Sequence, residues 1–198
     1  MPAMEAERAA GARRRQDPFD RPLGDVVRYR MSRGLELLLP DRPLPFGYRL
    51  EPYCEPMVPA YASVLAVAFA ESPDLALYPK LGTREGCKEL VREIGESPGF
   101  LPGASWLVLF SREPCALVLT SRTGREAYGN VLVVAVAPRH RRVRVGTHLV
   151  TKALWAFRDR RLERGEVKVN RSNRTGVIFF RSLGFQAAES ETFMESVD

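Results

Sequence analysis

The chain has 198 residues, of which 45% are hydrophobic and 27% are charged, with 30 Lys and Arg side chains against 24 Asp and Glu. Such a chain can bury a sizeable core without metal or disulfide support, which excludes disorder throughout and predicts one domain with a tail, or two small domains. The longest apolar runs are about seven residues, whereas a membrane-spanning helix needs roughly 20. No apolar stretch follows the basic N-terminus as in a signal peptide. We therefore expect a soluble, cytoplasmic protein with no membrane partner.

The net charge of +6 is concentrated in residues 139–164, where nine basic and two acidic side chains give a local charge of +7. A basic segment can bind nucleic acid, but the aromatic residues here do not form a stacking pattern and no nucleic-acid-binding motif is present. The sequence therefore disfavours a nucleic-acid partner, although that alternative stays open, and the excess charge needs a local explanation.

Cysteine and histidine are scarce. Cys54, Cys87 and Cys115 lack the spacing of a zinc site or a disulfide framework, and His140 and His148 are the only histidines. We predict no metal site, and we interpret each cysteine as a small buried side chain in a reducing compartment.

The N-terminal quarter of the chain divides into two segments before the predicted domain. Residues 1–21 contain few large apolar side chains, which predicts a mobile tail. Residues 22–46 form a lead-in segment, in which residues 26–39 show helical spacing of apolar positions before a proline-rich stretch. Residues 47–198 are expected to form a single folded domain.

The first part of that domain shows alternating strand and helix patterns. Residues 48–52 alternate as a short strand, and residues 56–70 and 83–94 show helical spacing, the second with Thr83 as N-cap. Residues 71–82 form a connecting loop of the length that often shapes a pocket.

The middle of the chain predicts three strands. Residues 106–110 and 116–120 are apolar runs joined by a hairpin signal, and residues 121–129 form the next turn. Residues 131–137 are continuously apolar, which predicts a central strand covered on both faces.

The last part predicts a helix over residues 147–161, a strand over 166–169 and a helix over 173–182 that Gly184 ends. Phe185 begins a short final strand. Several antiparallel strands followed by this alternation predict an α/β fold of the mixed α+β kind, in which helices cover both faces of one sheet.

The most specific segment is the central apolar strand, followed by PRHRRVRVG and an amphipathic helix. The N–H groups and dipole at a helix N-terminus favour anions, and arginines surround this one. Neither the GxxxxGK[ST] nor the GxGxxG pattern is present. The segment therefore predicts a pyrophosphate site of another type.

Two motifs in this region carry a family resemblance. The first is a proline followed after a few residues by Arg/Gln-x-x-Gly-x-Gly/Ala, and it aligns with Pro138 and the run Arg141-Arg142-Val143-Arg144-Val145-Gly146. The second, Asn-x-x-(small)-x-x-x-Tyr-x-x-x-Gly-Phe, aligns with Asn173, Gly176, Phe180, Gly184 and Phe185. In this order, and with about 26 residues between their anchors, these motifs make residues 47–195 resemble the GCN5-related N-acetyltransferase (GNAT) superfamily.

The resemblance implies a central, mostly antiparallel sheet with a splayed parallel strand pair. It also implies transfer of acetyl from acetyl-coenzyme A to a primary amine on a small molecule or peptide, without a metal. Dimers are common among relatives, so a homodimer is expected as one option. The implied cofactor-binding residues lie along the central strand, in the following loop and on the last helix: Val134, Ala135, Val136, Arg141, Arg142, Val143, Arg144, Val145, Gly146, Thr147, Asn173 and Phe180.

The sequence departs from the family pattern at positions that carry chemistry. Arg144 replaces a glycine, Phe180 replaces the tyrosine that reprotonates the thiolate, and Leu132 and Val133 replace polar residues of many relatives. An alternative is therefore a catalytically weakened relative that binds acyl-coenzyme A for structure or regulation.

Two residues before and at the start of the central strand are candidate replacements for the missing groups. Glu71, Asp74 and Tyr78, in the loop that would cover the substrate side, are further candidates. Among these five residues we favour Glu126 as the general base and Tyr128 as the general acid, because both precede the strand that would carry the thioester.

Overall fold

The computed structural model describes Phe19, residues 26–122 and residues 127–193. Seven strands form one sheet in the order β2-β3-β4-β5-β6-β1-β7. Neighbours are antiparallel except β5 and β6, which are parallel. The strands are β1 (Val26–Gly34), β2 (Tyr48–Pro52), β3 (Trp106–Phe110), β4 (Glu113–Arg122), β5 (Tyr128–Val136), β6 (Arg164–Asn170) and β7 (Gln186–Phe193).

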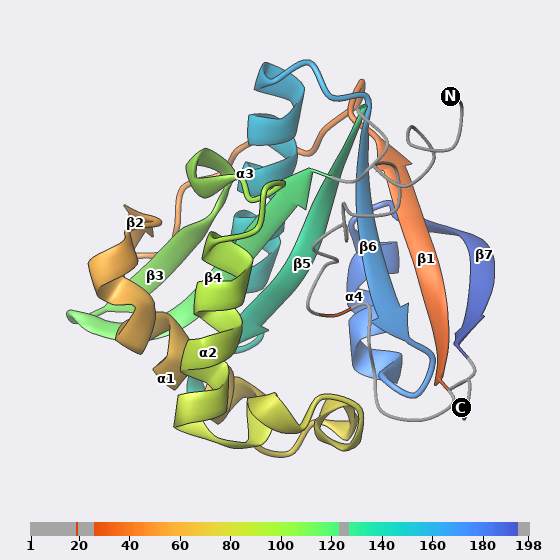
Figure 1. Cartoon of the computed structure of the whole chain (residues 1–198). Helices are drawn as coiled ribbons and strands as arrows, with labels where there is room; N and C mark the ends of the chain where they lie inside the picture. The colour runs from red at the N-terminus through yellow and green to blue at the C-terminus, as the bar shows by residue number, and fades with distance from the viewer. Residues whose placement is uncertain (1–18, 20–25, 123–126, 194–198) are drawn as a thin grey trace, which may run out of the picture.

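Helices cover both faces of this sheet, as predicted (Figure 1). They are α1 (Val58–Phe69), α2 (Arg84–Gly95), α3 (Val145–Asp159) and α4 (Arg174–Ser182), with short 3-10 turns η2 (Glu55–Met57), η3 (Pro73–Ala76), η4 (Pro79–Gly82), η5 (Pro102–Ala104) and η6 (Pro138–His140). One apolar core joins α1 and α2 to the sheet, and a second joins α3 and α4 to its opposite face. The mixed α+β prediction is confirmed.

Most of the predicted elements are present with shifted ends. Thr83 caps α2 by accepting a hydrogen bond from the backbone N–H of Gly86. The predicted helix over residues 147–161 begins two residues earlier, at Val145. Gly184, with φ of +85°, follows α4 in the left-handed conformation that favours glycine.

The predicted helix over residues 26–39 is wrong, because this segment begins with β1. Val27, Tyr29 and Met31 alternate with two arginines, and this period of two is the pattern of a strand. Tyr29 and Met31 face the core formed with α3 and α4, so Arg28 falls on the other face of the sheet. β1 lies between β6 and β7.

Of the predicted tail over residues 1–21, the structure describes Phe19 alone. Its ring packs edge-on against Tyr78, with a centroid distance of 5.3 Å. The Phe19 carbonyl accepts hydrogen bonds from the Tyr78 hydroxyl and from the Arg28 guanidinium. Phe19 thus contacts both the loop after α1 and the sheet.

β5 and β6 begin together and then diverge (Figure 1). Their parallel pairing runs from Tyr128 opposite Arg164 to Val131 opposite Val167. At the same place the β4–β5 register shifts, which leaves Leu132 as the extra residue of a β-bulge. The splayed parallel pair that the resemblance implied is therefore present, and β5 has an open edge beyond the bulge.

In the part of the chain that the structure describes, no helix is both long and apolar enough to cross a membrane. The three cysteines form no disulfide, and Cys87 and Cys115 are buried as expected. Cys54 is exposed, so the prediction that it is buried is wrong. It lies in the turn between β2 and η2, where its side chain is outside both cores.

Candidate active site

A cavity of about 940 Å³ opens where β5 and β6 diverge. Its walls come from β5, the end of β6, the first turns of α3 and α4, and the segment that follows α1. The loop over residues 71–82 contributes Glu71, Ser72, Asp74 and Tyr78, so the prediction that this loop shapes a pocket is confirmed.

The open edge of β5 forms one wall of the cavity. Val134, Ala135 and Val136 line it, and among the residues that the structure describes they pair with β4 alone. A strand edge without a partner offers backbone N–H and C=O groups to an extended ligand. This edge can therefore bind an amide-containing chain as an added strand.

The N-terminus of α3 lies at the end of that wall. The first intrahelical bond runs from the His148 N–H to the Arg144 carbonyl, so the N–H groups of Val145, Gly146 and Thr147 are not used within the helix. Gly146 and Thr147 line the cavity. Three such N–H groups and the helix dipole make this a suitable site for an anion.

Gly146 keeps the cavity wall closely packed. A β-carbon at this position would lie 3.3 Å from the Val136 side chain and 3.5 Å from the Phe179 ring. A side chain at residue 146 would crowd the contact of α3 with β5 and α4.

Two residues of the loop before α3 have a left-handed backbone. Arg142 has φ of +62° and Arg144 has φ of +67°. Arg144 is the N-cap of α3 and occupies the position of the family glycine, in the conformation that glycine favours. Both arginines line the cavity.

Arg141 has a different use. Its guanidinium donates hydrogen bonds to the Val136 carbonyl at 3.0 Å and to the Ala68 carbonyl at 2.8 Å. Ala68 lies in the last turn of α1, where carbonyls lack helical partners and a cation is favoured. Arg141 thus holds the loop to β5 and α1, which leaves Arg142 and Arg144 as the arginines at the anion site.

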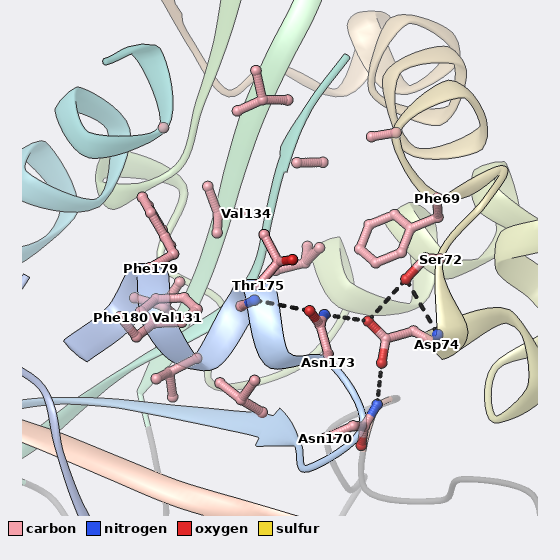
Figure 2. Close-up of a pocket in the computed structure, with 18 of the residues that line it drawn as sticks. Phe69, Ser72, Asp74, Val131, Val134, Asn170, Asn173, Thr175, Phe179 and Phe180 are labelled. Atoms are coloured by element: carbon pink, nitrogen blue, oxygen red, sulfur yellow. Dashed lines mark hydrogen bonds between the residues drawn. The ribbon is translucent and has the colours of Figure 1, made fainter. Parts of the chain in front are cut away.

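Asp74 lies on the side of the cavity away from α3 (Figure 2). Its carboxylate accepts hydrogen bonds from the Asn173 amide at 2.8 Å, from the Ser72 hydroxyl at 3.2 Å and from the Asn170 amide. The other side-chain atom of Asn173, Oδ1, accepts from the Gly176 N–H at 2.8 Å and caps α4. These bonds join the loop after α1 to the junction of β6 and α4.

Phe180 lines the cavity but is only 6% exposed. Its ring makes edge contacts with Phe179 and Phe185, at centroid distances of 5.1 Å and 5.3 Å. It therefore contributes packing at the place where the family motif has a phenol. Tyr78 is a phenol that lines the same cavity, and its hydroxyl receives a hydrogen bond from Arg28 at 3.3 Å.

The structure brings most of the predicted cofactor residues to one cavity, but not all of the predicted site. Val143 is exposed and Val145 is in the core, and neither lines the cavity. Tyr128 is half-buried at the start of β5 and does not line it either. Glu126 lies outside the described residues.

Asn170 is a cavity residue that the sequence reasoning missed. It is a polar residue at the carboxyl end of β6, and such ends border ligand sites in α/β sheets. That position was the available signal. No sequence signal indicated the hydrogen bond between Asn170 and Asp74, because the two residues are 96 positions apart in the chain.

Comparison with known proteins gives a family match. The sequence model described as the Acetyltransferase (GNAT) family matches residues 84–185, which is just over half of the chain. A search of curated proteins found no match.

Three solved structures share the fold. A GCN5-related N-acetyltransferase from Sphaerobacter thermophilus has a TM-score of 0.64 and 16% identity, over 89% of this chain and 55% of that chain. A tandem GNAT protein from the clavulanic acid biosynthesis pathway has a TM-score of 0.60 and 16% identity, over 97% of this chain and 57% of that one. The PaiA N-acetyltransferase from Thermoplasma acidophilum, in complex with coenzyme A, has a TM-score of 0.55 and 10% identity, over 68% of this chain and 87% of that chain. This chain thus spans little more than half the length of the first two, and at these identities the likeness establishes the fold alone.

Proposed function

Because this chain belongs to the GNAT acetyltransferase family, we propose that it transfers the acetyl group of acetyl-coenzyme A to a primary amine. One observation carries the proposal. The open edge of β5 and the unused N–H groups of α3 border the same cavity. An elongated ligand with amides at one end and phosphates at the other is complementary to both.

The residues present fit acetyl-coenzyme A in two places. The edge formed by Val134, Ala135 and Val136 would pair with the amides of the pantetheine arm. The first N–H groups of α3 would hold the pyrophosphate, and Arg142 and Arg144 would add charged hydrogen bonds to it.

Bound acetyl-coenzyme A supplies a thioester, whose carbonyl carbon is attacked by the amine while the C–S bond breaks and an amide forms. The chain contributes orientation and polarisation. Leu132 is the extra residue of the bulge, so backbone groups there leave the β4 ladder. We propose that a backbone N–H at this bulge stabilises the developing oxyanion.

Proton transfer uses few groups of this chain. Glu126 remains our proposed base, which takes a proton from the amine. Tyr128 lies away from the cavity lining, so the predicted acid role has no structural support. Since Phe180 has no proton to give, we propose that solvent protonates the departing thiolate.

Calorimetry with acetyl-coenzyme A tests the binding half of the proposal. We expect saturable binding, and Arg142→Gln together with Arg144→Gln should weaken it about tenfold, because charged hydrogen bonds to phosphate are lost. Arg181→Gln is the matched control, since Arg181 is exposed in the last turn of α4 and does not line the cavity. No binding at about 1 mM ligand would contradict the proposal.

A thiol-release assay over a panel of primary amines tests the reaction. Turnover with any amine supports the transferase. The second candidate function is a relative that binds acyl-coenzyme A without efficient transfer, and the apolar packing of Phe180 favours it. Binding without thiol release across the panel would select that second function.

We also propose a cytoplasmic location, because three unpaired thiols persist in a reducing compartment. The acceptor is proposed to be a small molecule or a peptide. A homodimer remains a proposal, and light scattering of the full chain tests it.

A further inference from the structure

We propose that Asp74 binds the ammonium form of the acceptor before the attacking nitrogen loses a proton to the proposed base, so that the acceptor is a cationic aliphatic amine. This inference rests on the proposed function, because it assigns the acceptor side of the same cavity. In the sequence, Asp74 is one of several candidate acid or base groups, and no motif assigns it this role.

The position of Asp74 is the first argument. Asp74 lines the cavity although its side chain is only 7% exposed. It lies beyond Asn173 as viewed from Val134 and Phe179, which border the open edge of β5 (Figure 2). A group held at Asp74 is therefore in the same cavity as the proposed thioester position and on the side that the cofactor edge does not occupy.

The charge of Asp74 is the second argument. Its partners are two amides and one hydroxyl, all of them neutral, and no Lys, Arg or His among the described residues forms an ion pair with it. A buried carboxylate without a counter-ion costs free energy even when it is hydrogen-bonded. An ammonium group in the cavity would offset that cost.

Arg28 is the cation closest to this network by strand pairing. It lies opposite Asn170 in the β1–β6 register, and Asn170 binds Asp74. The Arg28 guanidinium, however, donates to the Phe19 carbonyl and to the Tyr78 hydroxyl, not to Asp74. It holds another part of the loop, and within the described part of the chain it forms no ion pair with Asp74.

The rigidity of Asp74 is the third argument. The amides of Asn170 and Asn173 hold its two oxygens from β6 and from the start of α4. Ser72 accepts a hydrogen bond from the Asp74 backbone N–H at 3.2 Å and so fixes the turn. Such a carboxylate binds a cation without first losing side-chain freedom.

A purely structural tether is the competing explanation. The loop would then need hydrogen bonds to Asn170 and Asn173 but no charge, and an amide at position 74 could supply most of them. Replacement of the charge alone therefore separates the two explanations.

The test measures binding of n-butylammonium and of 1-butanol to the full chain saturated with coenzyme A, by NMR titration. The two probes have the same carbon chain and differ in charge. We expect the wild-type protein to prefer the ammonium by at least about tenfold. Asp74→Asn should abolish the preference while coenzyme A affinity stays within about twofold. Glu85→Gln, which removes an exposed carboxylate in the first turn of α2 outside the cavity lining, should retain the preference.

Several outcomes would overturn the inference. Equal binding of both probes to the wild-type protein would do so, even if Asp74→Asn does not fold. An unchanged preference in a folded Asp74→Asn protein would do so as well. Failure of acetyl-coenzyme A to bind would instead contradict the proposed function, so the two failures are distinguishable. Where an amine is turned over, Asp74→Asn should raise KM for the amine and leave KM for acetyl-coenzyme A unchanged.

Discussion

Arg144 combines an unfavourable backbone conformation with a useful charge. Its φ of +67° and ψ of +7° are left-handed, which costs a residue with a β-carbon about 1–2 kcal/mol. A guanidinium beside the α3 N-terminus would bind phosphate. Arg144 therefore places a positive charge at this position at the cost of a less favourable backbone conformation.

Arg144→Gly is expected to raise the free energy of unfolding by about 0.5–1 kcal/mol, because relief of the left-handed strain exceeds the entropy cost of glycine. Urea denaturation of both proteins measures this change in the free energy of unfolding. Arg144→Ala is the control, since alanine removes the same charge but keeps the β-carbon. An equal gain from alanine would show that charge, and not backbone conformation, sets the effect.

The three cysteines differ in exposure. Burial raises the pKa of Cys87 and of Cys115 to about 11. At pH 8 only about one in a thousand of these thiols is then ionised, and the thiolate is the reactive form. Cys54 is exposed to solvent.

We therefore expect one cysteine to react rapidly with a thiol reagent in the native protein at pH 8, and all three after unfolding. Cys54→Ser should remove the rapid reaction. Raising the pH towards 11 should speed the reaction of Cys87 and Cys115, because the ionised fraction of these thiols increases. Rapid reaction of two or more thiols at pH 8 would contradict the burial of Cys87 or Cys115.

α3 packs on the paired ends of β5 and β6 at two glycines. Gly129 and Gly165 are register partners in the parallel pair. A β-carbon at Gly129 would lie 2.5 Å from the Phe157 ring, and one at Gly165 would meet the Leu154 side chain. The absence of side chains thus sets how closely α3 approaches the strands from which the cavity opens.

Gly129→Ala should lower the free energy of unfolding by about 1–3 kcal/mol, because the added methyl group overpacks a closed core. Chemical denaturation of the variant and the wild-type protein measures this loss of stability. Gly82→Ala is the matched control, since a β-carbon there would be 3.7 Å from Leu75, an ordinary contact. If both variants lose equal stability, the close approach of α3 is not the cause.

The elements that sequence reasoning located correctly have strong local signals. β5 is continuously apolar, and α2 has a cap at Thr83. β1 was mistaken for a helix because its alternation places Arg28 and Arg30 on one face, and charged side chains do not usually mark a buried strand face. Pairing with β6 and β7 decided its conformation.

The positive charge of residues 139–164 serves several purposes across the protein. Arg141 holds a loop, Lys152 pairs with Asp41 at 3.0 Å, and the Arg158 guanidinium stacks 3.7 Å from the Trp155 ring centre. Arg142 and Arg144 line the cavity. The local excess of charge is therefore divided between internal support and the proposed phosphate site.

The sequence by itself determined the mixed α+β class, the central strand, the helix N-terminus after it and most residues of the proposed cofactor side of the cavity. These features depend on apolar periodicity, on capping residues and on motifs, which are local properties of a chain. The family match and the shared fold confirm that class.

Only the tertiary structure decided which residues meet on the proposed acceptor side. Asp74 and Asn173 are 99 positions apart in the chain, and they meet because the loop after α1 reaches the junction of β6 and α4. The structure also shows that the Arg141 guanidinium donates a hydrogen bond to the Ala68 carbonyl in α1, 73 positions away in the chain. No local pattern encodes such contacts, because they arise from the packing of helices on both faces of a splayed sheet.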